Sequence, residues 1–392
     1  MTGFENTEIA FAYKTNGELR KAYYLFKIVG SSWMVKMGKI ITQILLGLRL
    51  PISWAIKPTI YSHFCGGEYI PESIPVVESL SKYGVKVILD YSVEGKERPE
   101  DIKAALEETL KTISNAEDNP NIPFAVFKPT AFTTSHILEK VSTGDALSDG
   151  ETKEAQEFRV RIDTLCNAAY EKDIPILIDA EDSWYQKFID EVVEEMMEKY
   201  NQKKAIVFNT LQMYRKDRLE FLKELYRKAV QAGYFLGIKF VRGAYMEKER
   251  ERAQKMSYPD PINKDKPSTD KMYDDGLRFT IQHIDRISVF SGTHNEDSNI
   301  LLTQLMEEKG LMKNDQRIWF SQLYGMSDNI SFNLAAQGYN VAKYLPYGPV
   351  KHVLPYLIRR AEENTAMAGQ TSRELELVIK ERNRRRNSYD NE

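Results

Sequence analysis

After residue 84, short apolar runs alternate with longer charged stretches of helical pattern, and this alternation constrains the fold more than any other feature. The runs begin, in chain order, at Val85, Phe124, Pro175, Ala205, Phe235, Ile287, Arg317 and Tyr339. Near-continuous apolar runs are typical of strands buried on both faces, and strands that alternate with helices form parallel sheets. Eight strand–helix units therefore predict an α/β protein built on a (βα)8 barrel, a fold that usually takes about 250 residues.

A doubly wound open sheet is the alternative arrangement of the same elements. That fold normally carries a glycine-rich phosphate turn after its first strand, and this sequence has neither a G-x-G-x-x-G nor a Walker pattern. We therefore assign the barrel to residues 85–370. Residues 1–84 are predicted to be a helical extension packed on the barrel, and residues 371–392 a charged tail that is solvated or frayed.

Charge and cysteine usage narrow the partners and the compartment. The net charge of −3 gives no reason to expect a nucleic-acid partner. Cys65 and Cys166 have neither metal-binding spacing nor the pattern of a disulfide framework, which fits a reducing compartment. The N-terminal segment carries early acidic residues and lacks the features of a secretory signal or a transit peptide.

The most apolar segment runs from Trp33 to Ile56 and is interrupted by three basic residues and a proline. It falls short of the roughly 18 uncharged apolar residues that a membrane span needs. Two interpretations stay open for it: a buried packing helix, or a basic amphipathic helix that touches a membrane surface.

Polar side chains stand at the carboxyl ends of the eight predicted strands. They are Lys128, Asp179, Glu181, Gln212, Lys239, Arg242, Tyr245, Thr293, His294, Asn295, Gln322, Tyr344 and Tyr347. Each one alone is consistent with a solvated strand end. In a (βα)8 barrel, however, these ends meet at one mouth, where active sites are built.

The last apolar run leads into the stretch YLPYGPVKHVLPYLIRRAEEN, in which Pro355 is predicted to open or kink the final helix. The residues that follow this proline include four whose spacing places them on one helical face: Tyr356, Arg359, Arg360 and Glu363. Two adjacent guanidinium groups can grip both oxygens of a carboxylate ligand. A surface helix with an Arg–Glu pair is the alternative interpretation of these four residues.

Several other chemistries have less support. The five histidines show no metal-ligand spacing, and no G-x-S-x-G elbow indicates a serine hydrolase. A Schiff-base lyase stays open, because Lys128 and Lys239 both lie at strand ends. A non-catalytic scaffold would keep the barrel core but would need no polar mouth.

The motifs LIDAED, NTLQMY, KFVRGAY, GTHNEDS, QLYGMSD and YLPYGPVKHVLPYLIRRAEEN occur in an order that resembles the proline dehydrogenase family. The resemblance covers about Phe124 to Asn364, and HFCGGEY near residue 65 adds to it. The NTLQ and VRGAY motifs are similar to those of the stand-alone, mitochondrial-type branch of the family. The chain is too short to carry the aldehyde dehydrogenase domain of the bifunctional enzymes.

The resemblance implies a flavoenzyme that holds FAD on a distorted (βα)8 barrel. Such an enzyme oxidises L-proline to 1-pyrroline-5-carboxylate by hydride transfer to flavin N5, the first step of proline catabolism. It passes the electrons to a membrane quinone, which implies peripheral membrane association. The expected location is the cytoplasm or the inner membrane surface of a bacterium, or the mitochondrion of a eukaryote.

The resemblance also implies roles around the substrate. Arg359 and Arg360 match the pair that clamps the substrate carboxylate, and Lys128 matches a third cation near it. Tyr344 and Tyr356 match the aromatic walls of the proline ring. A further two positions, Asp179 and Tyr245, match residues that bridge and shape the pocket. The large side chain at Tyr344 implies a preference for proline over hydroxyproline.

Other positions match cofactor contacts of the family. Gln212 matches a residue on the flavin ring, Lys239 and Arg242 match positive groups that steady charge on the reduced flavin, and Glu363 matches a contact to the ribityl or ribose side. The segment by the FAD adenosine is matched by Thr293, His294 and Asn295. Lys239 replaces an arginine of the bifunctional members, so it keeps the charge but loses the planar fork.

Overall fold

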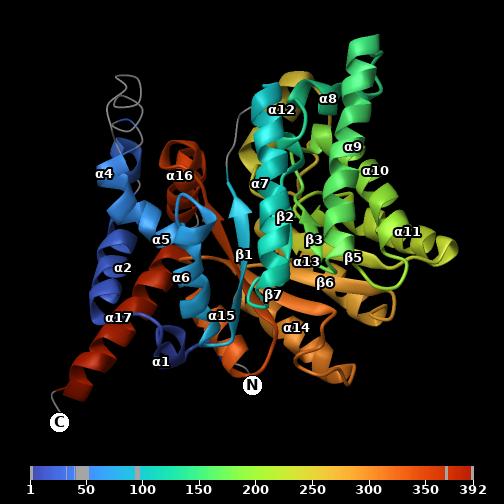
Figure 1. Ribbon diagram of the computed structural model, residues 1–392. Coiled ribbons are helices and arrows are strands. Elements are labelled where there is room, and N and C mark those ends of the chain that lie inside the picture. The colour runs from blue at the N-terminus through green and yellow to red at the C-terminus, as the bar shows by residue number, and fades with distance from the viewer. Residues whose placement is uncertain are drawn as a thin grey trace. The chain divides into compact units, whose positions relative to one another are not determined.

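The eight predicted strands are all present in the computed structural model, which describes residues 3–31, 33–38, 40, 53–92, 98–366 and 370–389 (Figure 1). They are β1 (Val85–Tyr91), β2 (Ala125–Phe127), β3 (Ile176–Ile178), β4 (Val207–Gln212), β5 (Leu236–Val241), β6 (Ile287–Gly292), β7 (Ile318–Leu323) and β8 (Val341–Tyr347). They form one sheet in the order β1-β8-β7-β6-β5-β4-β3-β2, and the neighbouring pairs with a defined register are parallel. This is the strand order of a TIM-like (βα)8 barrel, so the predicted fold is confirmed.

The chain divides into two compact units. The first consists of Met1–Glu94 and Gln322–Glu392, and the second of Gly95–Ser321. Each unit is described by itself below.

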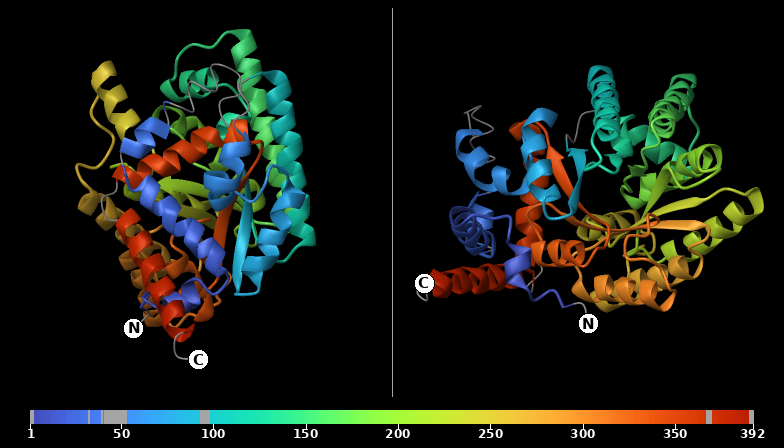
Figure 2. Two further views of the ribbon diagram at one scale, coloured as in Figure 1. Left: turned by 90° about the vertical axis from the view of Figure 1, so that its left-hand side faces the viewer. Right: turned by 60° about the horizontal axis from the view of Figure 1, so that its bottom comes forward.

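The second unit contains β2 to β6, the start of β7 and, among its described residues, nine helices from α7 to α14, counting η2. The helices are α7 (Pro99–Asp118), η2 (Pro129–Ala131), α8 (Ser135–Thr143), α9 (Asp149–Glu171), α10 (Ser183–Tyr200), α11 (Arg218–Ala232), α12 (Met246–Met256), α13 (Lys266–Gln282) and α14 (Glu296–Glu308). In Figure 2 these helices, coloured from cyan to orange, lie outside the strands of the unit. Residues of β3 and β4 are buried throughout, as strands covered on both faces must be.

An aromatic cluster fills the interior of the second unit near the start of its strands. The ring of Phe124 packs edge-on against Phe208, Phe290 and Trp319, with centroids 5.7, 5.1 and 5.2 Å away. Such edge-to-face pairs add to the burial of apolar area. The strands that carry the polar ends are therefore packed around a rigid aromatic core.

The first unit pairs β1 with β8 in parallel, and Ile88 lies opposite Tyr344. Its helices are α1 (Thr7–Ala10), α2 (Asn16–Val29), α4 (Ser53–Ile56), the π-helical turn η1 (Lys57–Tyr61), α5 (Ser62–Phe64), α6 (Ile70–Ser81), α15 (Asp328–Ala336), α16 (Val350–Ala366) and α17 (Gln370–Tyr389). A capping box between Thr15 and Glu18 starts α2. α2 and α17 lie side by side (Figure 1).

The C-terminal segment differs from the expectation of a solvated or frayed tail. Residues Gln370–Tyr389 form α17, and its Leu377 and Val378 pack into an apolar cluster with α2. Glu381 on the same helix is fully buried and accepts hydrogen bonds from Arg384 and Arg385. A few apolar residues and an internally paired carboxylate thus order a segment whose composition is mostly charged.

A further expectation concerns the start of the final helix. Pro355 does not open this helix: it lies inside α16, which begins at Val350, and α17 follows.

The described ends of the Trp33–Ile56 segment are helical, and Trp33 and Trp54 are 70% and 77% exposed. Residues 41–52 of that segment lie outside the described part of the chain. Among the described residues, no helix is both long and apolar enough to cross a membrane.

Candidate active site

A carboxylate flanked by two ammonium groups stands at the carboxyl ends of the strands of the second unit. Lys239 of β5 donates to Asp179 Oδ1 at 2.6 Å, and Lys128 Nζ lies 3.8 Å from Asp179 Oδ2. Lys239 is buried and Asp179 is largely buried, so little water screens the pair. The three groups together carry one net positive charge, which suits an anionic ligand or an anionic transition state.

Glu181, two residues after Asp179, is a buried carboxyl group in the same region. Its Oε1 accepts hydrogen bonds from the Thr130 hydroxyl at 2.7 Å and from the Thr130 backbone N–H at 3.3 Å. Burial raises the pKa of Glu181 to about 7, against the lowering effect of the Thr130 bond and of Lys128. The sequence places Glu181 at a strand end but gives it no role, because its partner Thr130 lies 51 residues away in the sequence, in η2.

Gln212 ends β4 and is buried. Its Nε2 donates to the backbone carbonyl of Glu181 at 2.6 Å. This bond holds the amide of β4 against the loop that follows β3. The side chain that the sequence predicts to touch a cofactor therefore has a fixed orientation.

Arg242, just after β5, is held on three sides. Its guanidinium donates to Asp270 at 2.7 Å, to the Thr293 hydroxyl at 2.5 Å and to the Ser298 hydroxyl at 3.0 Å. The group also lies 4.4 Å from the ring centroid of Tyr273. The structure thus brings Arg242 and Thr293 together, as the strand-end argument predicts.

The segment after β6 leads directly into α14. Asn295 caps this helix by accepting a hydrogen bond from Ser298 N at 2.8 Å, and Asn295 N donates to the Thr293 hydroxyl at 3.1 Å. His294 lies between them and is half-buried. The backbone N–H groups of the first helical turn point toward this end of α14, and the acidic side chains of Glu296 and Asp297 lie in the same turn.

Tyr245 precedes α12 and is half-buried. The helix is anchored by Glu249, whose fully buried carboxylate accepts from the Ser183 backbone N–H at 2.7 Å and from the Ser183 hydroxyl at 2.5 Å. Lys248 lies 5.8 Å from the Tyr245 ring centroid. The position of Tyr245 therefore depends on the contact between α12 and the start of α10.

The first unit contributes aromatic and cationic side chains from β8 and α16. Tyr344 and Tyr356 are buried, Arg360 is 8% exposed and Arg359 is half-buried. The Arg360 guanidinium lies 5.2 Å from the ring centroid of Tyr356, one helical turn before it. A surface helix with a solvated Arg–Glu pair does not describe this burial.

The turn from β8 into α16 is fixed by a buried hydrogen bond. Tyr61 of η1 donates its hydroxyl to the Gly348 carbonyl at 2.8 Å. Tyr356 joins the same apolar cluster as Tyr61 and Phe64. These contacts set the start of the helix that carries both arginines. The side chain of Glu363 lies outside the described residues.

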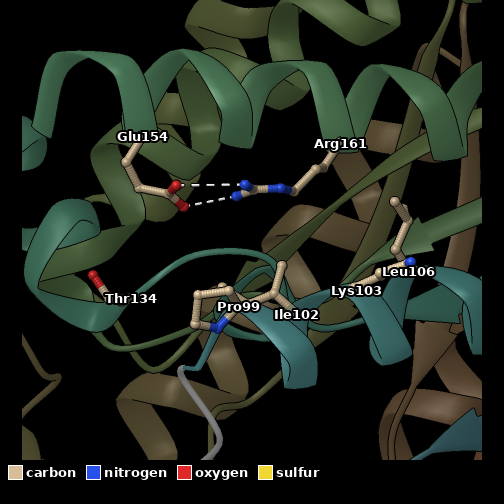
Figure 3. Close-up of a pocket in the computed structure, with 7 residues that line it drawn as sticks. All are labelled: Pro99, Ile102, Lys103, Leu106, Thr134, Glu154 and Arg161. Carbon is tan, nitrogen blue, oxygen red and sulfur yellow. Dashed lines mark hydrogen bonds and ion pairs between the residues drawn. The ribbon is translucent and has the colours of Figure 1, made fainter. Parts of the chain in front are cut away.

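A surface pocket of about 390 Å³ lies elsewhere on the second unit, between α7, the start of α8 and α9 (Figure 3). Its walls are Pro99, Ile102, Lys103, Leu106, Thr134, Glu154 and Arg161. Arg161 donates to both carboxylate oxygens of Glu154, at 2.7 and 3.4 Å. The lining contains no residue of the predicted site, so the pocket belongs to the outer helical layer.

The predicted site residues fall into two sets, one in each unit. The second unit holds Lys128, Asp179, Gln212, Lys239, Arg242, Tyr245, Thr293, His294 and Asn295, and the first holds Tyr344, Tyr356, Arg359 and Arg360. Direct contacts join Lys239 to Asp179, Arg242 to Thr293, and Arg360 to Tyr356. Among the described residues, no cluster of histidine, cysteine and acidic groups could hold a metal ion.

Comparison with known proteins adds independent findings. A family model described as proline dehydrogenase matches residues 74–373. "Proline dehydrogenase 1, mitochondrial" of Dictyostelium discoideum is 32% identical, and the match covers 97% of this chain and 74% of that protein. The human protein of the same name is 41% identical over 58% of this chain and 39% of its own length.

A second class of relative and a solved structure complete the comparison. "Carbapenem antibiotics biosynthesis protein CarD" of Pectobacterium carotovorum subsp. carotovorum is 34% identical over 83% of this chain and 84% of its own length. The crystal structure of proline utilization A from Bdellovibrio bacteriovorus, inactivated by N-propargylglycine, aligns with a TM-score of 0.72 at 19% identity. That alignment covers 96% of this chain but 38% of the solved chain, and at this identity it supports the fold alone.

Proposed function

Because this chain belongs to the proline dehydrogenase family, we propose that it oxidises L-proline to 1-pyrroline-5-carboxylate, the first step of proline catabolism. The observation that carries the proposal is the burial of Arg360 against Tyr356 on the helix after β8. A buried guanidinium beside an aromatic ring suits a small ligand that combines a carboxylate with an apolar ring. L-Proline has both features.

Binding of the substrate rests on positive charge at one end and aromatic walls along the ring. Arg359 and Arg360 grip the carboxylate, with Lys128 as a third cation. Tyr344 and Tyr356 line the proline ring, and Asp179 and Tyr245 shape the pocket. A carboxylate held at a fixed point determines which ring carbon faces the acceptor, and such positioning lowers barriers by several kcal/mol, about 7–11 at best.

The donor set of the second unit fits FAD. Lys239 and Arg242 offer N–H groups, Gln212 offers a fixed amide, and Thr293 and Asn295 stand beside the backbone N–H groups at the start of α14. Acceptor atoms of a flavin ring and anionic phosphates are the partners that such donors bind. His294 and Glu363 complete the residues that we assign to the cofactor. The bound flavin supplies the two-electron acceptor for the oxidation.

Electron transfer onward and location follow from the family rather than from a contact in this chain. We assign a membrane quinone as the final acceptor, with peripheral membrane association. The relatives from Dictyostelium and Arabidopsis are named as mitochondrial, so a mitochondrial location is proposed for a eukaryotic source. For a bacterial source we propose the cytoplasm, at the inner membrane surface.

A Schiff-base lyase finds less support than this proposal. A lysine acts as a nucleophile only with a free lone pair, and Lys239 instead donates to Asp179 at 2.6 Å. Borohydride in the presence of a keto acid should therefore leave the mass of the protein unchanged. A covalent adduct on Lys128 or Lys239 would favour the lyase.

An anaerobic absorbance titration tests the proposal. The purified protein should be yellow, and L-proline should bleach its flavin band, whereas D-proline at the same concentration should leave most of the band. A folded protein that carries flavin but does not respond to L-proline would remove the proposed substrate. A colourless protein that oxidises proline would remove the proposed cofactor.

A further inference from the structure

A chain of buried hydrogen bonds leads from a salt bridge between α10 and α11 to the side chain of Gln212. We propose that Asp190 and Gln186 are positioning residues: they hold the Glu181 backbone, whose carbonyl fixes the orientation of the Gln212 amide at the flavin. The inference rests on the proposed function, because it takes Gln212 as a flavin contact.

The chain is anchored by a buried ion pair. Arg218 at the start of α11 donates to Asp190 Oδ2 at 2.7 Å, and both side chains are 7% exposed. The other oxygen, Asp190 Oδ1, accepts from Gln186 Nε2 at 2.9 Å and from Asn209 Nδ2 at 3.0 Å. A carboxylate can only accept, so it forces the amide nitrogens of Gln186 and Asn209 to point toward it.

The chain of hydrogen bonds continues from Gln186 to the end of β4. Since its nitrogen faces Asp190, Gln186 presents Oε1 to the backbone N–H of Glu181, which donates at 2.8 Å. The carbonyl of Glu181 then accepts from Gln212 Nε2 at 2.6 Å. A carbonyl oxygen also only accepts, so the Gln212 nitrogen must face it. The Gln212 carbonyl oxygen is therefore turned away from Glu181.

The Glu181 residue at the centre is held from a second direction. Its side chain accepts both hydrogen bonds from Thr130, so its backbone and its carboxyl group are fixed by different elements. Lys128 lies two residues before Thr130, at the start of η2. The network thus connects the amide assigned to the cofactor with the loop that carries a cation assigned to the substrate.

Stability alone gives a poor account of this network. A buried ion pair is often no better than well-packed apolar side chains of similar volume. Within the described residues, the Asn209 Oδ1 and Arg218 Nε atoms of the same network have no hydrogen-bond partner, which carries a further cost. The network does give its donors and acceptors a fixed order, and such order favours one arrangement of the side chains.

An exchange of charge between two positions tests the order of the bonds. Gln186→Glu alone places two carboxylates face to face, and Asp190→Asn alone removes the acceptor that orients Gln186. The double variant Gln186→Glu with Asp190→Asn restores the bond between the two positions, because the introduced amide nitrogen can donate to the new carboxylate while the amide oxygen still accepts from Arg218. The Asn209 amide then turns its Oδ1 atom toward the introduced nitrogen. Glu194→Gln is the matched control, since it neutralises a partly exposed carboxylate on the same helix.

Two readouts of the flavin separate orientation from packing. FAD affinity is measured by titration of the apoprotein, and the flavin absorption maximum and midpoint potential are measured on the loaded protein. Each single variant should bind FAD about tenfold more weakly and shift the absorption maximum and the potential. The double variant should return within about twofold of the wild type, and Glu194→Gln should match the wild type throughout.

The outcomes separate this inference from the proposed function. Unchanged FAD affinity and spectrum in both single variants would overturn the network, as would a double variant as impaired as the sum of the two. If a single variant fails to fold by circular dichroism, Gln186→Met removes the same bonds without a buried charge and should give the same shift. A wild type that holds FAD but is not reduced by L-proline overturns the proposed substrate only, and a wild type that binds no FAD overturns both.

Discussion

Replacement of Asp179 by asparagine tests the electrostatics of the site most simply. The variant keeps the shape of the side chain but removes the charge between Lys239, at 2.6 Å, and Lys128, at 3.8 Å. Lys239 is 6% exposed at its side chain, so water cannot replace the lost counter-ion. The folded state should become less stable, because a buried ammonium group is left with less compensation.

The magnitude follows from distance and burial. Two unit charges about 4 Å apart attract by about 4 kcal/mol at an effective dielectric constant of about 20, and desolvation offsets part of this. Removal of one partner from a fully buried pair costs about 3–5 kcal/mol. The Asp179 side chain is 16% exposed, which screens the pair in part. We therefore expect the free energy of unfolding to fall by about 2–3 kcal/mol.

Urea denaturation followed by circular dichroism measures this free energy. The control is Asp275→Asn on α13, the same substitution in an ion pair at 2.5 Å whose lysine partner, Lys271, is 75% exposed. Exposed pairs of this kind contribute about 0.3–0.5 kcal/mol. If Asp179→Asn costs no more than this control, Asp179 is not the main counter-ion of Lys239.

Three further expectations concern the substrate and pH. Arg359→Met or Arg360→Met should raise the KM for L-proline at least about tenfold in steady-state assays with dye reduction, because a charged hydrogen bond to the carboxylate is lost. A change under about twofold would show that the residue does not bind the carboxylate. The bulk of Tyr344 should make kcat/KM higher for L-proline than for hydroxyproline, and the reverse order would contradict its role as a wall. Burial, with a contribution from Asp328, raises the pKa of Glu374 to about 7 from 4.5, so the native state holds a proton that the unfolded chain releases and stability falls as pH rises between these values. Glu374→Gln should therefore be more stable than the wild type by about 1–3 kcal/mol at about pH 8 and equal to it near the unfolded pKa, and urea midpoints that differ equally at both pH values would contradict the assignment.

The strands were predictable because their sequence pattern has a direct physical cause. A strand covered on both faces is expected to be apolar along its length, and β2 (AVF) and β3 (ILI) appear in the sequence as continuous runs. The polar residue that follows such a run, such as Asp179 after β3, stands out for the same reason. The face shared by Tyr356 and Arg360 also follows from spacing alone, since one turn of a helix separates them.

Other features depend on contacts that a linear pattern does not contain. The roles of Glu181 and Asp190 come from partners on other strands and helices, such as Thr130 and Arg218. Helix α17 is ordered by two apolar residues among many charges, so its composition resembles that of a solvated tail. Tertiary packing decides such cases, because it supplies partners that local propensity cannot anticipate.

Comparison of L-proline with pyrrolidine measures how much the substrate carboxylate contributes to binding at the arginine pair. Pyrrolidine has the ring and the amine of proline but lacks the carboxylate. The FAD-loaded protein is titrated anaerobically with L-proline and with pyrrolidine, and the two ligands are compared at equal concentrations of the unprotonated amine. The titrations measure the concentration of each ligand that reduces the flavin. We expect L-proline to reduce the flavin at concentrations at least about a hundredfold lower than pyrrolidine, which corresponds to about 2.7 kcal/mol of discrimination. Arg360→Met should lose most of that advantage. Equal potency of the two compounds in the wild type would show that the carboxylate is not held by the arginine pair.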